Sequence, residues 1–149
     1  MNRVVKLLFW LVGGMVLLVG LIQLVPYGRS HTNPPVVQEP AWDSVQTREL
    51  AQRACFDCHS NETDWSPWYA SVAPASWLVQ RDVDEARREL NFSEWSEKAS
   101  RGGRMAEEAG EVIREGEMPP AQYLLMHPEA DLTAAEKELL AKGLEASLR

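Results

Sequence analysis

Side chains that bind metals are few in this chain, which has 149 residues but only two cysteines and three histidines. A structural zinc site needs four ligands, and these side chains stand at no zinc-finger spacing. Both cysteines fall in one short motif, so no thiol is left for a structural disulfide. With so few histidines, the residue order indicates no nucleophile and base of a hydrolytic triad either. The composition therefore gives no support to a zinc-stabilised domain, a disulfide-stabilised domain or a triad hydrolase.

The two cysteines belong to Cys55-Phe56-Asp57-Cys58-His59, which has the spacing of the attachment motif for c-type haem. Each thiol adds to one vinyl group of the porphyrin, and the histidine that follows can bind the iron as proximal ligand. A thioredoxin-type pair has the same cysteine spacing, but it stands at the start of a helix after a strand. Here the pair ends a helical stretch and no strand is expected before it. We predict one covalent haem c, with Cys55 and Cys58 as thioethers and His59 as proximal iron ligand.

Charge is absent from residues 7–25, a mostly apolar run whose one strongly polar member is Gln23. Nineteen helical residues at about 1.5 Å each just span a hydrocarbon core of about 30 Å. Arg3 and Lys6 precede the run, which favours an N-terminus in the cytoplasm and export of the rest. A cleaved signal peptide is the competing interpretation, but no small-x-small cleavage site follows the run. We therefore predict a retained anchor in the cytoplasmic membrane, with the soluble domain on the periplasmic or outer side.

A proline-rich linker follows the apolar run. The stretch from Pro26 to Pro40 carries four prolines and lacks helical periodicity, so we expect it to be semi-extended. His31 lies in it, and we expect its ring to be solvated. The predicted boundaries are a cytoplasmic N-terminus at 1–6, a transmembrane anchor at 7–26, a linker at 27–41 and a haem c-binding domain at 42–149.

The first soluble helix leads into the haem motif. Asp43 with Gln46 three residues later fits an N-cap signature, and the helix is expected to run into Cys55. One face of this helix is marked by the i, i+3, i+4 and i+7 positions Thr47, Leu50, Ala51 and Ala54. The haem motif is therefore predicted at the C-terminal end of a helix.

Helical periodicity continues through the rest of the chain. Further helices are expected at 75–90, from Trp95 to Gly116 with a kink or break at Gly102–Gly103, and from Thr133 onward. Glu136 completes a capping box with Thr133, and Gly143 would allow close helix crossing. This pattern predicts an all-α domain.

Aromatic side chains gather after the motif, at Trp65, Trp68, Tyr69 and Trp77. Haem is a wide, flat and largely apolar plate, so a pocket for it needs large rings. An ordinary core also collects aromatic residues. In a domain this small much of the core must be the haem pocket, so we predict that these four side chains line it.

Three residues after the motif could reach the iron as its sixth ligand, Met118, Met126 and His127, and the main candidates are Met118 and His127. Pro119 and Pro120 follow Met118 and are expected to hold its backbone in an extended loop. His127 is the rival, because an imidazole binds iron more strongly. We favour Met118, since His/Met ligation is the usual cytochrome c pairing and raises the potential.

A larger set of segments resembles a family of small bacterial haem-binding domains, and more broadly class I cytochromes c. These segments are residues 55–63, Trp68-Tyr69, 74–77, 91–95, 118–120 and 127–130. The resemblance covers about residues 42 to 142. It implies an all-α fold of three to five helices around one haem, in which the first and last soluble helices cross. Met118 stands in the place of the distal ligand. It also implies a proline carbonyl that accepts a hydrogen bond from His59, for which Pro74 is the matching residue and Pro67 is the second choice.

One-electron transfer needs a tuned iron near the surface but no general base, so we predict an electron carrier rather than an enzyme. A haem-based sensor or gas-binding domain with an open sixth position is the alternative, and a weak peroxidase-like activity is a third. From Ser30 onward there are 12 basic residues (15 minus Arg3, Lys6 and Arg29) against 22 acidic ones, a formal charge of −10. We expect a redox partner with a basic docking face and no nucleic-acid partner.

Overall fold

The structure, a computed structural model, describes residues 2–95 and 102–148. In these ranges the regular secondary structure is helical, apart from an isolated bridge between Gln38 and Glu94. The prediction of an all-α fold is confirmed. The chain forms two compact units, Met1–Thr32 with Trp65–Asp82, and Asn33–Asp64 with Val83–Arg149.

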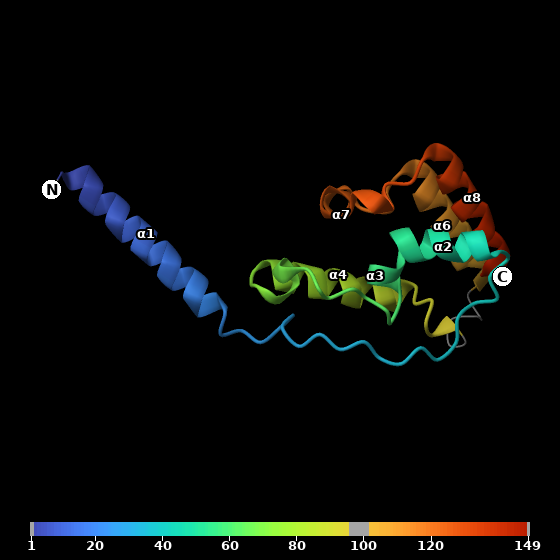
Figure 1. Cartoon of the computed structure of the whole chain (residues 1–149), viewed down its shortest axis with the longest axis horizontal. Coiled ribbons are helices and arrows are strands. Elements are labelled where there is room, and N and C mark those ends of the chain that lie inside the picture. The colour runs from blue at the N-terminus through green and yellow to red at the C-terminus, as the bar shows by residue number, and fades with distance from the viewer. Residues whose placement is uncertain (1, 96–101, 149) are drawn as a thin grey trace. The chain divides into compact units, whose positions relative to one another are not determined.

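The first unit contains the apolar helix α1, Arg3–Ile22, which is drawn in blue in Figure 1. By length and composition α1 can cross a membrane, a test that a signal sequence also passes. Its side chains are exposed almost throughout. The same unit contains the 3-10 helix η1, Trp68–Ser71, and the first part of α4, Ala75–Glu89.

In the second unit, helix α2, Val45–Ala54, runs into the haem motif as predicted. Its N-cap is Ser44, so the prediction of Asp43 is wrong by one position. Ser44 has the extended backbone of a cap, and its hydroxyl accepts a hydrogen bond of 3.1 Å from the Thr47 amide. The backbone N–H of Asp43 instead donates to Ser147 Oγ at 2.9 Å, which ties the start of α2 to the end of α8.

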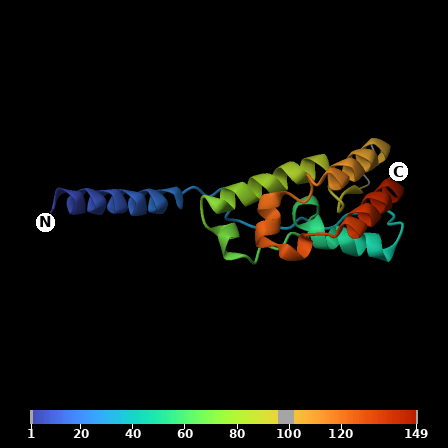
Figure 2. The same ribbon diagram turned by 90° about the horizontal axis from the view of Figure 1, so that it is seen from above.

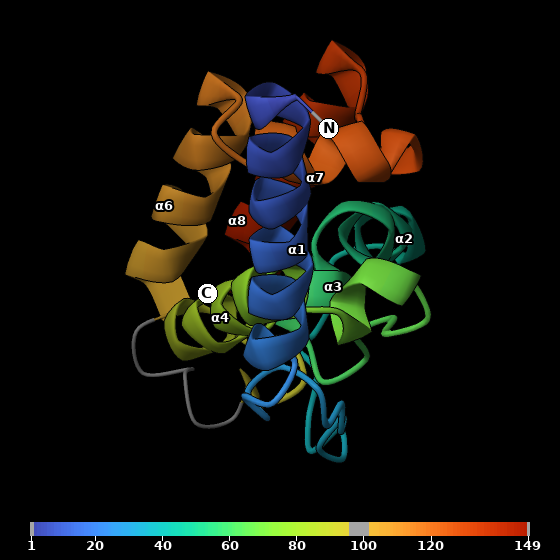
Figure 3. The ribbon, with the colours of Figure 1, turned by 90° about the vertical axis from the view of Figure 1, so that its left-hand side faces the viewer.

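The remaining helices of the second unit are α3, Phe56–His59; α6, Gly102–Glu115; α7, Ala121–Met126; η3, Pro128–Ala130; and α8, Ala134–Ser147. Helices α6 and α8 lie side by side in Figure 2, and α2 packs on α8. Figure 3 shows α3 beside the end of α2. The short α7 was not expected from the sequence. The break predicted at Gly102–Gly103 coincides with the first residues of α6, and 96–101 lie outside the described residues.

The crossing of α2 and α8 depends on Gly143, as its sequence position suggested. A Cβ at Gly143 would collide with the Thr47 side chain, which is fully buried on α2. The capping box of Thr133 and Glu136 at the start of α8 is also present. Beneath the crossing, Leu50, Leu140 and Leu144 form part of the buried core. The first and last soluble helices therefore cross as predicted.

Candidate functional site

The haem motif is wound into a single turn at the end of α2. The backbone carbonyl of Cys55 accepts hydrogen bonds from the amides of Cys58, at 3.2 Å, and His59, at 2.8 Å. Phe56 is buried and anchors this turn in the core, while Cys55, Cys58 and His59 remain half-buried. The fold thus brings both thiols and the imidazole together on one turn, formed by α3 and its N-cap, Cys55.

His59 is held in the tautomer that a metal ligand requires. Its Nδ1 lies 3.1 Å from the backbone carbonyl oxygen of Leu90, which can only accept a hydrogen bond. Nδ1 therefore carries the hydrogen, and the lone pair is on Nε2. Burial lowers the pKa of His59, which favours the neutral ring. The acceptor in the structure is thus the carbonyl of Leu90, which the sequence gave no reason to select, and not that of Pro74, which the resemblance had implied.

The thiol of Cys55 does not resemble that of a redox-active pair. Burial, and next the neighbouring Cys58, raise the pKa of Cys55 to about 12. Thioredoxin-type motifs instead lower the pKa of their reactive cysteine, so that a thiolate exists at neutral pH. The free thiol of Cys55 is therefore protonated under ordinary conditions, which argues against disulfide exchange.

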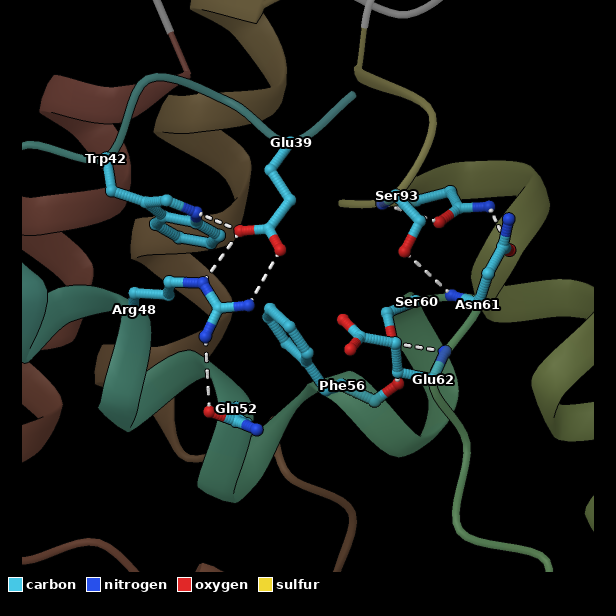
Figure 4. Close-up of polar contacts among 10 residues, drawn as sticks. Glu39, Trp42, Arg48, Gln52, Phe56, Ser60, Asn61, Glu62 and Ser93 are labelled. Atoms are coloured by element: carbon cyan, nitrogen blue, oxygen red, sulfur yellow. Dashed lines mark hydrogen bonds and ion pairs between the residues drawn. The ribbon is translucent and has the colours of Figure 1, made fainter. Parts of the chain in front are cut away.

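A buried asparagine network holds the segment after His59 against the segment that carries Leu90 (Figure 4). The backbone N–H of Asn61 donates to Ser93 Oγ at 2.9 Å, and Asn91 Nδ2 donates to the side-chain oxygen Oδ1 of Asn61 at 3.0 Å. The Phe92 amide donates to the His59 carbonyl at 2.8 Å. These contacts fix the distance between the imidazole and its acceptor.

Arg87, on α4, also holds the segment after His59 through hydrogen bonds. Its Nε donates to the Ser60 carbonyl at 2.8 Å, and its Nη2 donates to Thr63 Oγ1 at 2.9 Å and to Asn33 Oδ1 at 3.2 Å. Burial lowers the pKa of Arg87, against the attraction of Asp84. The guanidinium therefore joins the linker, the loop after the motif and α4.

An ion pair and an aromatic cluster cover Phe56, the second residue of the motif. Arg48 makes a bidentate pair with Glu39, at 2.7 and 2.8 Å, and its guanidinium carbon lies 5.4 Å from the centre of the Phe56 ring. Trp42 Nε1 donates to Glu39 at 2.6 Å (Figure 4). The Phe56 ring in turn stacks on Phe92 at 5.5 Å. The linker is thereby fastened over the haem motif.

The two candidates for the distal ligand flank α7. Met118 follows the end of α6 and is 38 % exposed. His127 follows α7, and its ring stacks on Tyr123 with centroids 4.2 Å apart. The Tyr123 hydroxyl donates to Asp57 Oδ2 at 2.7 Å, so α7 is linked to the residue between the two cysteines. Neither the sequence pattern nor the motif had pointed to this contact.

The four aromatic residues predicted for the pocket lie in the first unit. Trp68 contacts Tyr69 edge to face at 6.0 Å, while Trp65 stacks on His31 with centroids 4.2 Å apart and planes at 11°. His31 is half-buried, so the prediction that its ring is solvated is wrong; the broad face of Trp65 covers it. The assignment of these aromatic side chains to a haem pocket stays a prediction.

Comparison with known proteins identifies one family. The profile of a family described as haem-binding domain matches residues 17–146, and the chain belongs to this family. No curated protein and no solved structure matches the chain. The match begins within α1 and includes the linker, so it extends further toward the N-terminus than the resemblance seen in the sequence.

The chain's own residues fit the haem that the family implies. Both thiols and the imidazole stand on one turn, and the Leu90 carbonyl leaves His59 Nε2 with its lone pair. In residues 2–95 and 102–148, no three side chains of His, Cys, Asp or Glu gather into another metal site. The donor set therefore suits a haem held by two thioethers and one imidazole.

Proposed function

We propose that the chain is a membrane-anchored c-type cytochrome that transfers single electrons through one covalent haem. The observation that carries the proposal is the geometry of Cys55, Cys58 and His59 on one turn, with His59 Nδ1 held by Leu90. When bound, the haem supplies an iron that alternates between the ferrous and ferric states. Cys55 and Cys58 would hold the haem through thioethers, and the oriented imidazole of His59 would bind its iron and tune its potential.

The sixth position is assigned to Met118, with His127 as the alternative. A thioether is a weak and neutral ligand, so the backbone must hold it in place. The amides of Glu117 and Met118 both donate to the Val112 carbonyl, at 2.9 and 3.2 Å, which fastens this segment to the end of α6. His/Met ligation raises the potential and suits an electron carrier.

The anchor is assigned to α1, and the haem domain to the outer side of the cytoplasmic membrane. The two cations before the run, Arg3 and Lys6, support this orientation. The family match from residue 17 includes the last part of α1 and the linker, which supports their retention in the working protein. The formal −10 charge of the soluble part favours a partner with a basic docking face. Transfer rates that fall with added salt would support that partner.

Covalent attachment is tested with the chain produced alongside a haem-attachment system. Acid-acetone extraction should leave the colour on the wild-type polypeptide and none on the variant with Cys55→Ala and Cys58→Ala. Oxidised and reduced spectra of the same membranes report the haem type and the spin state. Extraction of all colour from the wild-type chain would refute the covalent haem.

A gas-binding or sensor domain is the second candidate, and one observation favours it. Helix α7, between the two possible distal ligands, has no fully buried side chain, and only Tyr123 and Leu124 are half-buried. A loosely packed distal segment would leave the sixth position weakly held. Rapid binding of carbon monoxide to the ferrous wild-type protein, without denaturant, would favour this second function over electron transfer.

A further inference from the structure

The first unit is largely free of charge. Residues 65–80 contain no Asp, Glu, Lys, Arg or His, although charged residues make up 25 % of the chain. Residues 7–28 contain none either. These two stretches, far apart in sequence, belong to the same compact unit.

Three contacts join residues 65–80 to the residues that follow α1. Gln23 and Ala73 exchange two hydrogen bonds, from Gln23 Nε2 to the Ala73 carbonyl at 2.9 Å and from the Ala73 amide to Gln23 Oε1 at 3.0 Å. Gly28, with φ of +67°, packs against the Ser76 carbonyl so closely that a Cβ would collide with it. The third contact is the stack of His31 on Trp65. Ala73 is therefore fixed next to the residue that follows α1.

Apolar side chains around these contacts are exposed. Trp68 is 74 % exposed and Leu78 is 59 % exposed, and each stands five positions from Ala73. The exposed apolar residues of this part of the unit are Leu24, Val25, Tyr27, Trp68, Val72 and Leu78. Contiguous exposed apolar surface is unfavourable in water and marks a surface that something covers.

We propose that the surface formed by Tyr27, Trp68, Val72 and Leu78, here called the interfacial surface, lies in the headgroup region of the bilayer that α1 spans. The inference rests on the proposed anchoring by α1. The hydrogen bonds between Ala73 and Gln23 keep this surface at the end of the spanning helix. Tryptophan and tyrosine are enriched at that depth, where a ring meets both hydrocarbon and water. The absence of charge avoids the cost of desolvating ions near hydrocarbon.

The haem is the other candidate occupant of this surface, because the sequence predicts Trp68 as a pocket residue. The two charge-free stretches, residues 7–28 and 65–80, meet next to the end of α1. This favours lipid over haem as the group that covers Trp68 and Leu78. Trp65, Tyr69 and Trp77 are not part of the interfacial surface.

The test uses full-length holoprotein in nanodiscs of phosphatidylcholine and phosphatidylglycerol. Once Cys55 and Cys58 are bound to haem, Trp68→Cys or Leu78→Cys introduces the only free thiol, to which a nitroxide is attached. Both substitutions replace exposed side chains, and the haem absorbance checks folding. Glu111→Cys, at an exposed position of α6, is the matched control.

Labels at 68 and 78 should be relaxed more by dissolved oxygen, which concentrates in lipid, than by a water-soluble nickel chelate. The label at 111 should show the reverse order. Preferential relaxation of the labels at 68 and 78 by nickel would overturn the proposal, and so would relaxation of the Trp68→Cys label by the ferric iron. Alkaline carbonate extraction tests the anchor separately: if the wild-type chain leaves the membrane, the anchor has failed, whatever the labels show.

Discussion

The hydroxyl of Tyr123 donates a hydrogen bond of 2.7 Å to Asp57, the residue between Phe56 and Cys58. Burial, and next this hydrogen bond, raise the pKa of Tyr123, so the phenol keeps its proton and remains the donor. Asp57 is itself held, because its Oδ1 accepts from the Asp64 amide at 3.0 Å. The contact therefore positions α7 against the turn that carries the haem motif.

The first prediction follows from this contact. Tyr123→Phe keeps the ring and removes the donor, so α7 should loosen and the ferrous haem should bind carbon monoxide roughly tenfold faster, as expected for about 1.4 kcal/mol from one hydrogen bond to a carboxylate. Stopped-flow mixing with carbon monoxide measures the rate.

A double-mutant cycle and a control accompany this prediction. Asp57→Ala should have a similar effect, and the double variant should be no faster than either single one. Asp57→Asn should retain much of the slow binding, since its amide oxygen still accepts the hydrogen bond. Tyr27→Phe, in the other compact unit, should leave the rate unchanged. Additive effects of the Tyr123 and Asp57 variants would show that the contact does not position α7.

The second prediction concerns the asparagine network around His59. Asn61→Ala should lower the free energy of unfolding by about 1–3 kcal/mol, because the buried Asn91 amide loses its acceptor. The bond between His59 and the iron should also break at a lower temperature. The haem spectrum would show this as a change of spin state. Thermal melts in detergent, followed at the haem absorbance, measure both. Gln122→Ala, at an exposed position of α7, is the control and should melt like the wild type.

The third prediction tests the helix crossing. Gly143→Ala should destabilise the fold by about 1–3 kcal/mol, because the added methyl group would collide with the buried Thr47 side chain. Gly103→Ala provides the matched control, since a Cβ there meets no atom within 4 Å. It should be neutral or slightly stabilising, as alanine favours a helix more than glycine does. Equal melting temperatures for the two variants would contradict the tight crossing.

Much of the helical framework could be predicted because its signals are local. The capping box of Thr133 and Glu136 and the spacing of Leu50 and Ala51 on α2 depend on residues a few positions apart. The motif likewise indicates its own chemistry. The acceptor for His59 could not be predicted, because a backbone carbonyl leaves no mark on the identity of Leu90. Contacts such as Tyr123 with Asp57 join residues 66 positions apart, and no local pattern selects them.

The stacking of His31 on Trp65 was missed for the same physical reason. Prolines around His31 correctly indicate a stretch without helix, but lack of helix does not imply exposure. A segment can be extended and still be covered by a ring that is distant in sequence. Linker composition therefore predicts backbone conformation better than it predicts burial.

The fourth prediction concerns acid. The hydrogen bond with Arg48 holds the pKa of Glu39 below its ordinary value of 4.5. Because the folded state favours the charged carboxylate, the contribution of Glu39 to stability is present above pH 4.5 and is lost as the pH falls below it. Glu39→Gln should thus be less stable than the wild type at pH 7, and the difference should shrink below pH 4.5. Urea unfolding of both proteins at pH 7 and below pH 4.5 measures this difference in stability. A difference that grows in acid would contradict the ion pair.

The last prediction distinguishes the two distal candidates, Met118 and His127. If Met118 binds the iron, Met118→Ala should lower the potential, because a thioether stabilises ferrous iron. The variant should also open the ferrous form to carbon monoxide and lose the weak long-wavelength absorption that sulfur ligation gives ferric haem. His127→Ala should keep that band and nearly the same potential, although it removes the ring that stacks on Tyr123. Its carbon monoxide rate therefore has to be compared with that of Tyr123→Phe, which disturbs α7 without removing a ligand. If the band survives in Met118→Ala while His127→Ala opens the iron, the ligation is bis-histidine and the assignment of Met118 fails.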